Sequence, residues 1–163
     1  MKREYYKSTI KEFLYSSPSE IIGTLATSNE FALEQSQLDA WLEEIYILQS
    51  TLTTYNGSIY FEYTIPRMGK RIDVLVIIKS VIFLLEFKVG ESEFKSHSVD
   101  QVWDYALDLM NFHETSHNCY VAPILIATNA KKSISVISTT NLNDKILSPI
   151  MCGSGDIQKI IDK

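Results

Sequence analysis

The chain has few cysteines and no long apolar run, which argues against a disulfide-stabilised scaffold and against a membrane-spanning protein. Its 163 residues include only two cysteines, Cys119 and Cys152, which lie far apart without a paired spacing. A disulfide scaffold is therefore not expected, and a reduced, cytosolic setting is. No apolar run approaches the roughly 20 residues of a membrane helix. The opening residues, MKREYYKSTIKEF, also lack the apolar stretch of a signal peptide. The sequence predicts a cytoplasmic protein that does not enter a membrane.

An excess of basic residues is also lacking. The net charge is −5, from 15 Lys and Arg against 20 Asp and Glu. The global basic footprint of many nucleic-acid-binding proteins is thus missing. One local basic cluster remains, formed by Arg67, Lys70 and Arg71. Such a cluster can contact phosphates, or it can be an ordinary solvated loop.

The patterns that are present predict one domain, spanning residues 1–163, with a mixed sheet. Leu38, Trp41, Ile45 and Leu48 recur at helical spacing and predict one amphipathic helix. Strands are expected at 59–65, 72–78, 81–89, 120–128 and 133–139, and helices at 16–28, 34–52, 98–112 and 155–163. Residues 1–30 are interpreted as an N-terminal helical extension. This order is typical of an α/β or α+β fold.

The stretch VIFLLEFKV is apolar on both faces, and yet it carries Glu86 and Lys88. Apolar residues on both faces predict a central strand covered on both sides. Only Lys79 and Ser80 separate this strand from the preceding one, which predicts a two-residue hairpin loop. That register places Asp73 opposite Glu86, with β-carbons about 4.5–5.5 Å apart.

Two carboxylates in these positions repel each other unless a cation lies nearby. Hard divalent cations such as Mg²⁺ bind carboxylate, water and phosphate oxygens, so an ion between Asp73 and Glu86 would remove the conflict. Lys88 lies on the same strand face as Glu86, where it can orient a water or a phosphate. The alternative is an ordinary ion pair between Glu86 and Lys88 near a strand end, with Asp73 on a polar edge.

The segments RIDVLV and FLLEFK together resemble the PD-(D/E)XK nuclease superfamily. The resemblance implies the restriction-endonuclease-like fold, with an αβββαβ core, and catalytic roles for Asp73, Glu86 and Lys88. Ile72 stands where the name of the motif would place proline. FEYTIPRMGKRID, EFKVG and DQVWDYALDLMNFH are more narrowly similar to a bacterial domain found ahead of a P-loop helicase-like ATPase module. The chain itself contains no G-x-x-x-x-G-K-[ST] sequence.

The same resemblance implies two further parts of a site. One branch of the superfamily carries Gln-x-x-x-Tyr on the next helix, where QVWDY supplies Gln101 and Tyr105. The alternative is a capping box that starts at Ser98, with Tyr105 packed as core. Such nucleases often take another acidic ligand from the first core helix. Glu44 borders the apolar stripe there and Glu43 points away from it, although Glu44 can also be a solvated boundary residue.

The function implied is the hydrolysis of phosphodiester bonds of DNA, with RNA as the alternative substrate and Mg²⁺ or Mn²⁺ as cofactor. The implied metal ligands are Glu44, Asp73, Glu86 and the carbonyl of Phe87. Nucleic acid would contact Arg67, Lys70 and Arg71. A helicase-like ATPase is an implied partner, and a homodimer an implied assembly. The alternatives are a non-catalytic nucleic-acid-binding or regulatory module that works with such an ATPase, and a protein-interaction domain.

The segment HETSH, residues 113–117, matches the H-E-x-x-H motif of zinc proteases. That motif requires a helix that continues through both histidines and a third ligand. Asn118 and an expected strand follow immediately, so we interpret the segment as a polar connection between helix and strand.

Overall fold

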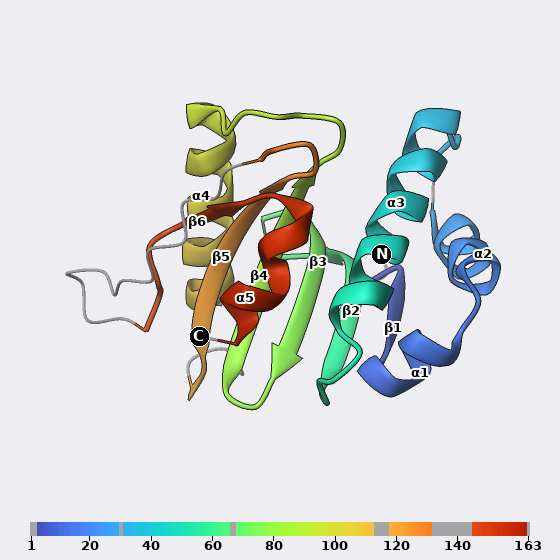
Figure 1. The fold of residues 1–163 in the computed structure, drawn as a ribbon, viewed down its shortest axis with the longest axis horizontal. Helices are drawn as coiled ribbons and strands as arrows, with labels where there is room; N and C mark the ends of the chain where they lie inside the picture. The colour runs from blue at the N-terminus through green and yellow to red at the C-terminus, as the bar shows by residue number, and fades with distance from the viewer. Residues whose placement is uncertain (1–2, 30, 66–67, 113–117, 132–144, 163) are drawn as a thin grey trace.

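The structure is a computed structural model that describes residues 3–29, 31–65, 68–112, 118–131 and 145–162. These segments form an α+β fold around a six-stranded mixed sheet with the order β1-β2-β3-β4-β5-β6 (Figure 1). The strands are β1 (Tyr6–Thr9), β2 (Ser58–Thr64), β3 (Arg71–Ile78), β4 (Val81–Lys88), β5 (Tyr120–Ala127) and β6 (Ile150–Cys152). Neighbours from β1 to β4 are antiparallel, whereas β5 runs parallel to β4 and β6 to β5. The predicted mixed-sheet class is confirmed.

Helices cover both faces of this sheet. They are α1 (Ile10–Tyr15), α2 (Pro18–Ser28), α3 (Gln35–Thr51), α4 (Ser96–Phe112) and α5 (Ile157–Ile161). Buried residues of α1, α2, α3 and α5 share one core with strand residues such as Phe61 and Ile124, which we call the α3-side core. Val102 and Ala106 of α4 pack with Leu84 in a second core, the α4-side core. Figure 1 shows α5 in front of the sheet and α4 behind it.

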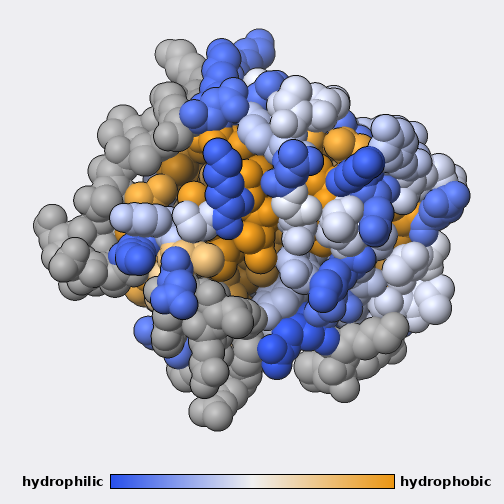
Figure 2. Space-filling model, turned by 90° about the horizontal axis from the view of Figure 1, so that it is seen from below, coloured by the Kyte–Doolittle hydropathy of each residue, from blue (hydrophilic) through white to orange (hydrophobic). Residues whose placement is uncertain are grey.

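Among the described helices, α4 contributes buried residues to the α4-side core. A cavity of about 390 Å³ remains there, and Leu75, Ile77, Ile82 and Leu109 contribute to its lining. Seen from below, the molecule shows apolar residues between hydrophilic side chains (Figure 2). Asp73 and Glu86 lie at the opposite end of the central strands, where β3 begins and β4 ends.

The tight hairpin predicted between β3 and β4 is present. The pairing runs from Ile78–Val81 to Val74–Leu85, so two residues form the loop. Lys79, the first of them, has φ of 55°. The left-handed region at this position suits a two-residue turn that joins right-twisted strands. The next pair of positions after Val74–Leu85 is Asp73 and Glu86. The hairpin register therefore places the two predicted carboxylates opposite each other, at the end of the hairpin away from the turn.

The starts of two helices can be compared with the sequence patterns. Ser17 caps α2, because its hydroxyl accepts a hydrogen bond from the amide of Glu20 at 3.2 Å, and the predicted start is confirmed. Helix α4 begins at Ser96, so the prediction that Ser98 opens it is wrong. Ser98 lies within the first turn, is 2% exposed, and its amide donates to the carbonyl of Lys95 at 3.0 Å.

Among the described residues, the short strands β1 and β6 were not predicted, whereas α1 and α2 both lie in the predicted N-terminal helical extension. Strand β1 lies at the edge of the sheet with Tyr6 opposite Phe61, so residues 1–30 contain a strand as well as α1 and α2. The expected strand at 133–139 and the HETSH segment at 113–117 lie outside the described residues. Within the described ranges, no helix combines the length and the apolar character needed to cross a bilayer.

Candidate functional site

The two predicted carboxylates meet at the open end of the β3–β4 hairpin. The amide of Asp73 donates to Oε1 of Glu86 at 3.0 Å, and the amide of Phe87 donates to Oδ2 of Asp73 at 2.9 Å. Backbone pairing of the two strands ends one row earlier, at Val74–Leu85. Side-chain oxygens thus replace backbone carbonyls as acceptors in this row. The predicted placement of Asp73 against Glu86 is confirmed.

A third carboxylate, Glu62 of β2, lies on the other side of Asp73. The β2–β3 pairs Phe61–Val74 and Tyr63–Ile72 flank the row that Glu62 and Asp73 share. Glu62 has φ of 53°, a conformation that costs a non-glycine residue about 1–2 kcal/mol. Strain of this kind inside a strand is common at functional sites.

Glu62 is held by the helix above it, since Nε1 of Trp41 donates to its Oε1 at 3.0 Å. Sequence reasoning missed this residue. The hairpin argument could not reach it, because β2 and β3 are joined by residues 65–70 rather than by a two-residue turn. The available signal was a single carboxylate between buried Phe61 and Tyr63 in an otherwise aromatic strand.

Helix α3 supplies the fourth carboxylate of the cluster. Glu44 is 4% exposed, whereas its neighbour Glu43 is exposed, as the helical wheel predicts. The alternative of a solvated boundary residue is therefore wrong for Glu44. Burial, and after it the charges of Asp73, Glu62 and Glu86, raise the pKa of the Glu44 carboxyl. The helix thus places a buried acid over the carboxylate row of the sheet.

Burial is the main reason why the pKa of each of these four carboxyl groups lies above its ordinary value. The negative charge of Asp73 is the second cause for Glu44, Glu62 and Glu86, and the pKa of Glu62 reaches about 7. The amide hydrogen bonds and the charge of Lys88 oppose the rise at Asp73 and Glu86. Ionising the whole cluster requires a positive charge close to it.

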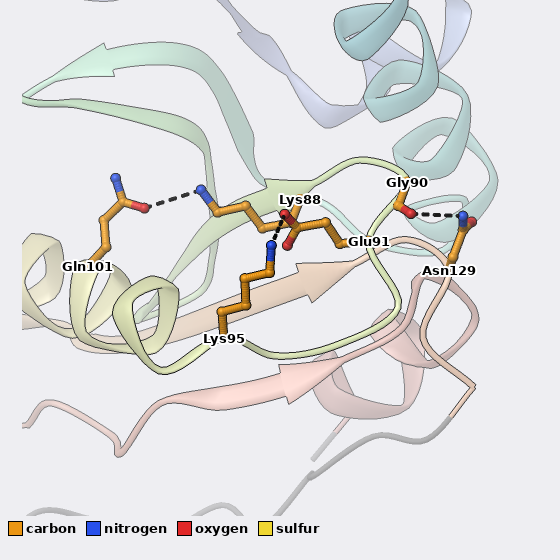
Figure 3. Close-up of polar contacts among 6 residues, drawn as sticks. All are labelled: Lys88, Gly90, Glu91, Lys95, Gln101 and Asn129. Carbon is orange, nitrogen blue, oxygen red and sulfur yellow. Dashed lines mark hydrogen bonds and ion pairs between the residues drawn. The ribbon is translucent and has the colours of Figure 1, made fainter.

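Lys88 begins a hydrogen-bond chain that reaches helix α4. Its Nζ donates to Oε1 of Gln101 at 3.3 Å, and Nε2 of Gln101 donates to the hydroxyl of Tyr105 at 2.9 Å. Figure 3 shows Lys88 extended from β4 toward Gln101 on the helix. The capping-box alternative for Gln101 is wrong, because α4 begins at Ser96 and the Gln101 side chain is used in this chain.

The alternative of an ordinary ion pair between Glu86 and Lys88 is not supported by the structure. Among the ion pairs of the described residues, none joins Lys88 to Glu86. The carboxylate of Glu86 nevertheless affects helix α4. Burial raises the pKa of Tyr105, and the charge of Glu86 is the next cause. Asp73, Glu86, Lys88, Gln101 and Tyr105 therefore lie in one region, as predicted.

The predicted basic cluster does not form one patch. Nζ of Lys70 lies 3.0 Å from Oδ2 of Asp108 on α4. The guanidinium of Arg71 lies 4.1 Å from the ring centroid of Tyr5, which belongs to the α3-side core. The two cations therefore turn to opposite faces of the sheet. Arg67 lies outside the described residues.

The donor chemistry of the cluster fits a hard divalent cation. Glu44, Glu62, Asp73 and Glu86 offer carboxylate oxygens, which Mg²⁺ and Mn²⁺ prefer. Within the part of the chain that the structure describes, no three His, Cys, Asp or Glu side chains are arranged to hold a metal ion. One oxygen each of Asp73 and Glu86 is instead held by a backbone amide. The metal ligand roles, including that of the Phe87 carbonyl, stay predictions.

Two comparisons with known proteins found no match. No model of a known protein family matches the chain, and no curated protein matches it. The chemistry of the site is therefore argued from its own residues.

Proposed function

We propose that this chain is a divalent-metal-dependent nuclease that hydrolyses phosphodiester bonds, with DNA rather than RNA as substrate. The observation that carries the proposal is the contact of Asp73 and Glu86 on paired strands. Glu44 is buried beside them, and Lys88 follows Glu86 on the same strand face. Buried acids next to an anchored lysine are the groups that phosphodiester hydrolysis uses. The resemblance to PD-(D/E)XK nucleases, drawn from the same residues, agrees with this.

The carboxylates have the role of holding the cation. Glu44, Asp73 and Glu86 would bind Mg²⁺ or Mn²⁺, with the Phe87 carbonyl as a further ligand. When bound, such an ion makes water a better nucleophile and draws charge from the scissile phosphate. In the reaction the water oxygen forms a new bond to phosphorus and releases a proton, the bond from phosphorus to the leaving sugar oxygen breaks, and that oxygen takes up a proton, so the net transfer is from the attacking water to the leaving group.

Lys88 has the role of positioning the attacking water or the phosphate. Gln101 and Tyr105 act through Lys88. Since Nε2 of Gln101 donates to the Tyr105 hydroxyl, its Oε1 must face Lys88, which fixes the direction of the ammonium group. Removing the Gln101 amide should therefore lower kcat more than it raises KM.

Digestion of plasmid DNA and of labelled DNA and RNA oligonucleotides, with Mg²⁺ or Mn²⁺, tests the proposal. The wild type should cut, and Lys88→Ala should cut about 100-fold more slowly, the scale for losing one charge-stabilising donor. Lys159→Ala is the matched control, because Lys159 lies on α5 and its Nζ lies 3.4 Å from Oδ1 of Asp156. A wild type that cuts no substrate, or equal rates for wild type and Lys88→Ala, would contradict the proposal.

A second candidate function is a non-catalytic nucleic-acid-binding module that works with an ATPase partner. The observation that favours it is the internal satisfaction of the site, in which Asp73 and Glu86 already accept amide hydrogen bonds. Burial raises the pKa of both carboxyls, so protons can replace a cation there. This candidate predicts oligonucleotide binding without cleavage in the same assay.

A further inference from the structure

A cavity of about 430 Å³ opens next to the carboxylate row. Tyr5, Phe31, Trp41, Glu62 and Arg71 are among its lining residues. Pockets of this size suit a small molecule or one residue of a polymer. Glu62 belongs both to the cavity lining and to the row that contains Asp73. The cavity is thus continuous with the candidate site.

Three aromatic side chains, Tyr5, Phe31 and Trp41, contribute to the walls of this cavity. Trp41 and Tyr5 are buried at 2% and 6% exposure, whereas Phe31 is 76% exposed. A phenylalanine that lines a cavity and is yet so exposed has a free ring face. Planar rings stack on such faces, and every nucleobase has a planar ring.

Arg71 supplies a polar atom that calls for a ligand. Its guanidinium stacks over Tyr5 at 4.1 Å, and its Nη1 is buried without a hydrogen-bond partner among the described residues. A buried donor left without an acceptor costs about 1–3 kcal/mol, so an acceptor that enters the cavity would favour a turn of the Arg71 guanidinium toward it. A base carbonyl or ring nitrogen is an acceptor of the right kind.

The charges of the cavity lining favour a nucleobase over a phosphate as the bound group. Glu34 and Glu62 face one cation, Arg71, in the described lining. This balance repels a phosphate inside the cavity, but it accepts a neutral base that carries both donors and acceptors. The phosphate of the same nucleotide then remains outside, on the side of Asp73, which follows Arg71 by two positions in β3.

We propose that this cavity receives one unpaired nucleobase of a nucleic-acid strand whose backbone lies at the carboxylate row. The base stacks on Phe31 and accepts a hydrogen bond from Arg71. The inference rests on the proposed function and deepens it, because it makes single strands, or duplexes with an unpaired base, the substrate class. A fully paired duplex keeps its bases stacked and cannot fill the cavity without extruding one.

Fluorescence anisotropy with a labelled thymidine dodecamer tests this directly. Binding is measured with Ca²⁺ and again with EDTA, against a blunt duplex of the same length. We expect tighter binding of the single strand, and a loss of about 5- to 100-fold in Phe31→Ala, the range for removing one stacking ring. Tyr15→Ala is the matched control, because Tyr15 is an equally exposed ring at 83% on α1, outside the cavity lining.

Quenching of tryptophan fluorescence by the dodecamer provides a second readout. Trp41 lines the cavity, and Trp103 lies on α4, so the Trp103→Phe variant isolates the Trp41 signal. The strand should quench this signal, and Arg71→Met should require a higher strand concentration for the same effect. An unchanged signal during binding would place the base elsewhere and overturn the proposal.

The outcomes separate this inference from the nuclease proposal. Equal affinities of wild type and Phe31→Ala, equal affinities for single strand and duplex, or no binding of either would overturn the cavity assignment, even if the chain cuts DNA. Single-strand binding that depends on Phe31, in a chain that cuts nothing, would support the cavity assignment and refute the nuclease.

Discussion

Replacing Glu62 by glutamine should stabilise the fold at alkaline pH and have little effect in acid. Burial and the charge of Asp73 raise the pKa of Glu62 from 4.5 to about 7. Glutamine keeps an acceptor oxygen for the hydrogen bond from Nε1 of Trp41, which is 3.0 Å long in the wild type. The substitution thus removes the charge while keeping the shape and the hydrogen bond.

The sign follows from proton binding in the two states. Because the pKa is higher in the folded chain, the folded state binds more protons than the unfolded state between pH 4.5 and about pH 7, and stability falls across this window as pH rises. The full difference corresponds to about 3.4 kcal/mol at 1.36 kcal/mol per pKa unit. Solvent at the half-buried carboxylate screens part of it, so about 2 kcal/mol should separate the variant from the wild type at about pH 8.

Urea unfolding in EDTA, followed by tryptophan fluorescence at about pH 5 and about pH 8, measures this difference through the midpoint at constant slope. Glu43→Gln is the matched control, because Glu43 lies on α3 next to the cluster and is exposed. It should change stability equally little at both pH values. Glu62→Gln that destabilises at about pH 8, or shifts stability equally at both pH values, would refute the raised pKa of the half-buried Glu62 carboxyl.

Two further predictions concern the cation and the hairpin. Mg²⁺ or Mn²⁺ at about ten times the Kd should stabilise the wild type by about 1.4 kcal/mol, a rise in Tm of about 3–5 °C, because an ion offsets the repulsion between the acids. Calorimetry should show no such rise in Tm for Asp73→Asn. Asp100→Asn, at an exposed position of α4, is the control and should respond like the wild type. An equal rise in the wild type and in both variants would exclude a cation at the carboxylate cluster. Lys79→Gly should stabilise by about 0.5–1 kcal/mol, because Lys79 has φ of 55° and glycine adopts this conformation without strain. Ser80→Gly, at the next loop position, should instead destabilise in the same denaturation assay, and the reverse order would contradict the turn geometry.

The strongest periodic signals predicted their elements well. The apolar stripe around Trp41 and Ile45 predicted α3, and the two-residue gap between apolar runs predicted the register that joins Asp73 to Glu86. Both depend on local spacing, which the sequence displays directly. The side that Glu44 faces was predictable for the same reason, since a helical wheel needs only residue numbers.

The elements that were missed depend on tertiary contacts. Strand β1 has four residues and β6 has three, too short for alternation to stand out, and each forms because a neighbouring strand offers an edge. Glu62 escaped prediction because no two-residue turn joins β2 to β3, so the sequence does not display the register that places it beside Asp73. The start of α4 was misplaced because Ser98 has the chemistry of a cap but is buried within the first turn.

The row at Asp73 and Glu86 fastens two strands as well as presenting two acids. The amides of Asp73 and Phe87 depend on these carboxylates for acceptors, so truncating either side chain leaves a backbone donor without its partner. Alanine at either position would therefore disturb the hairpin as well as remove a carboxylate, so two separate causes would contribute to any loss of the proposed nuclease activity. Asparagine at 73 and glutamine at 86 keep an acceptor oxygen, so these two variants separate the loss of a carboxylate charge from the loss of the contact that joins the strands.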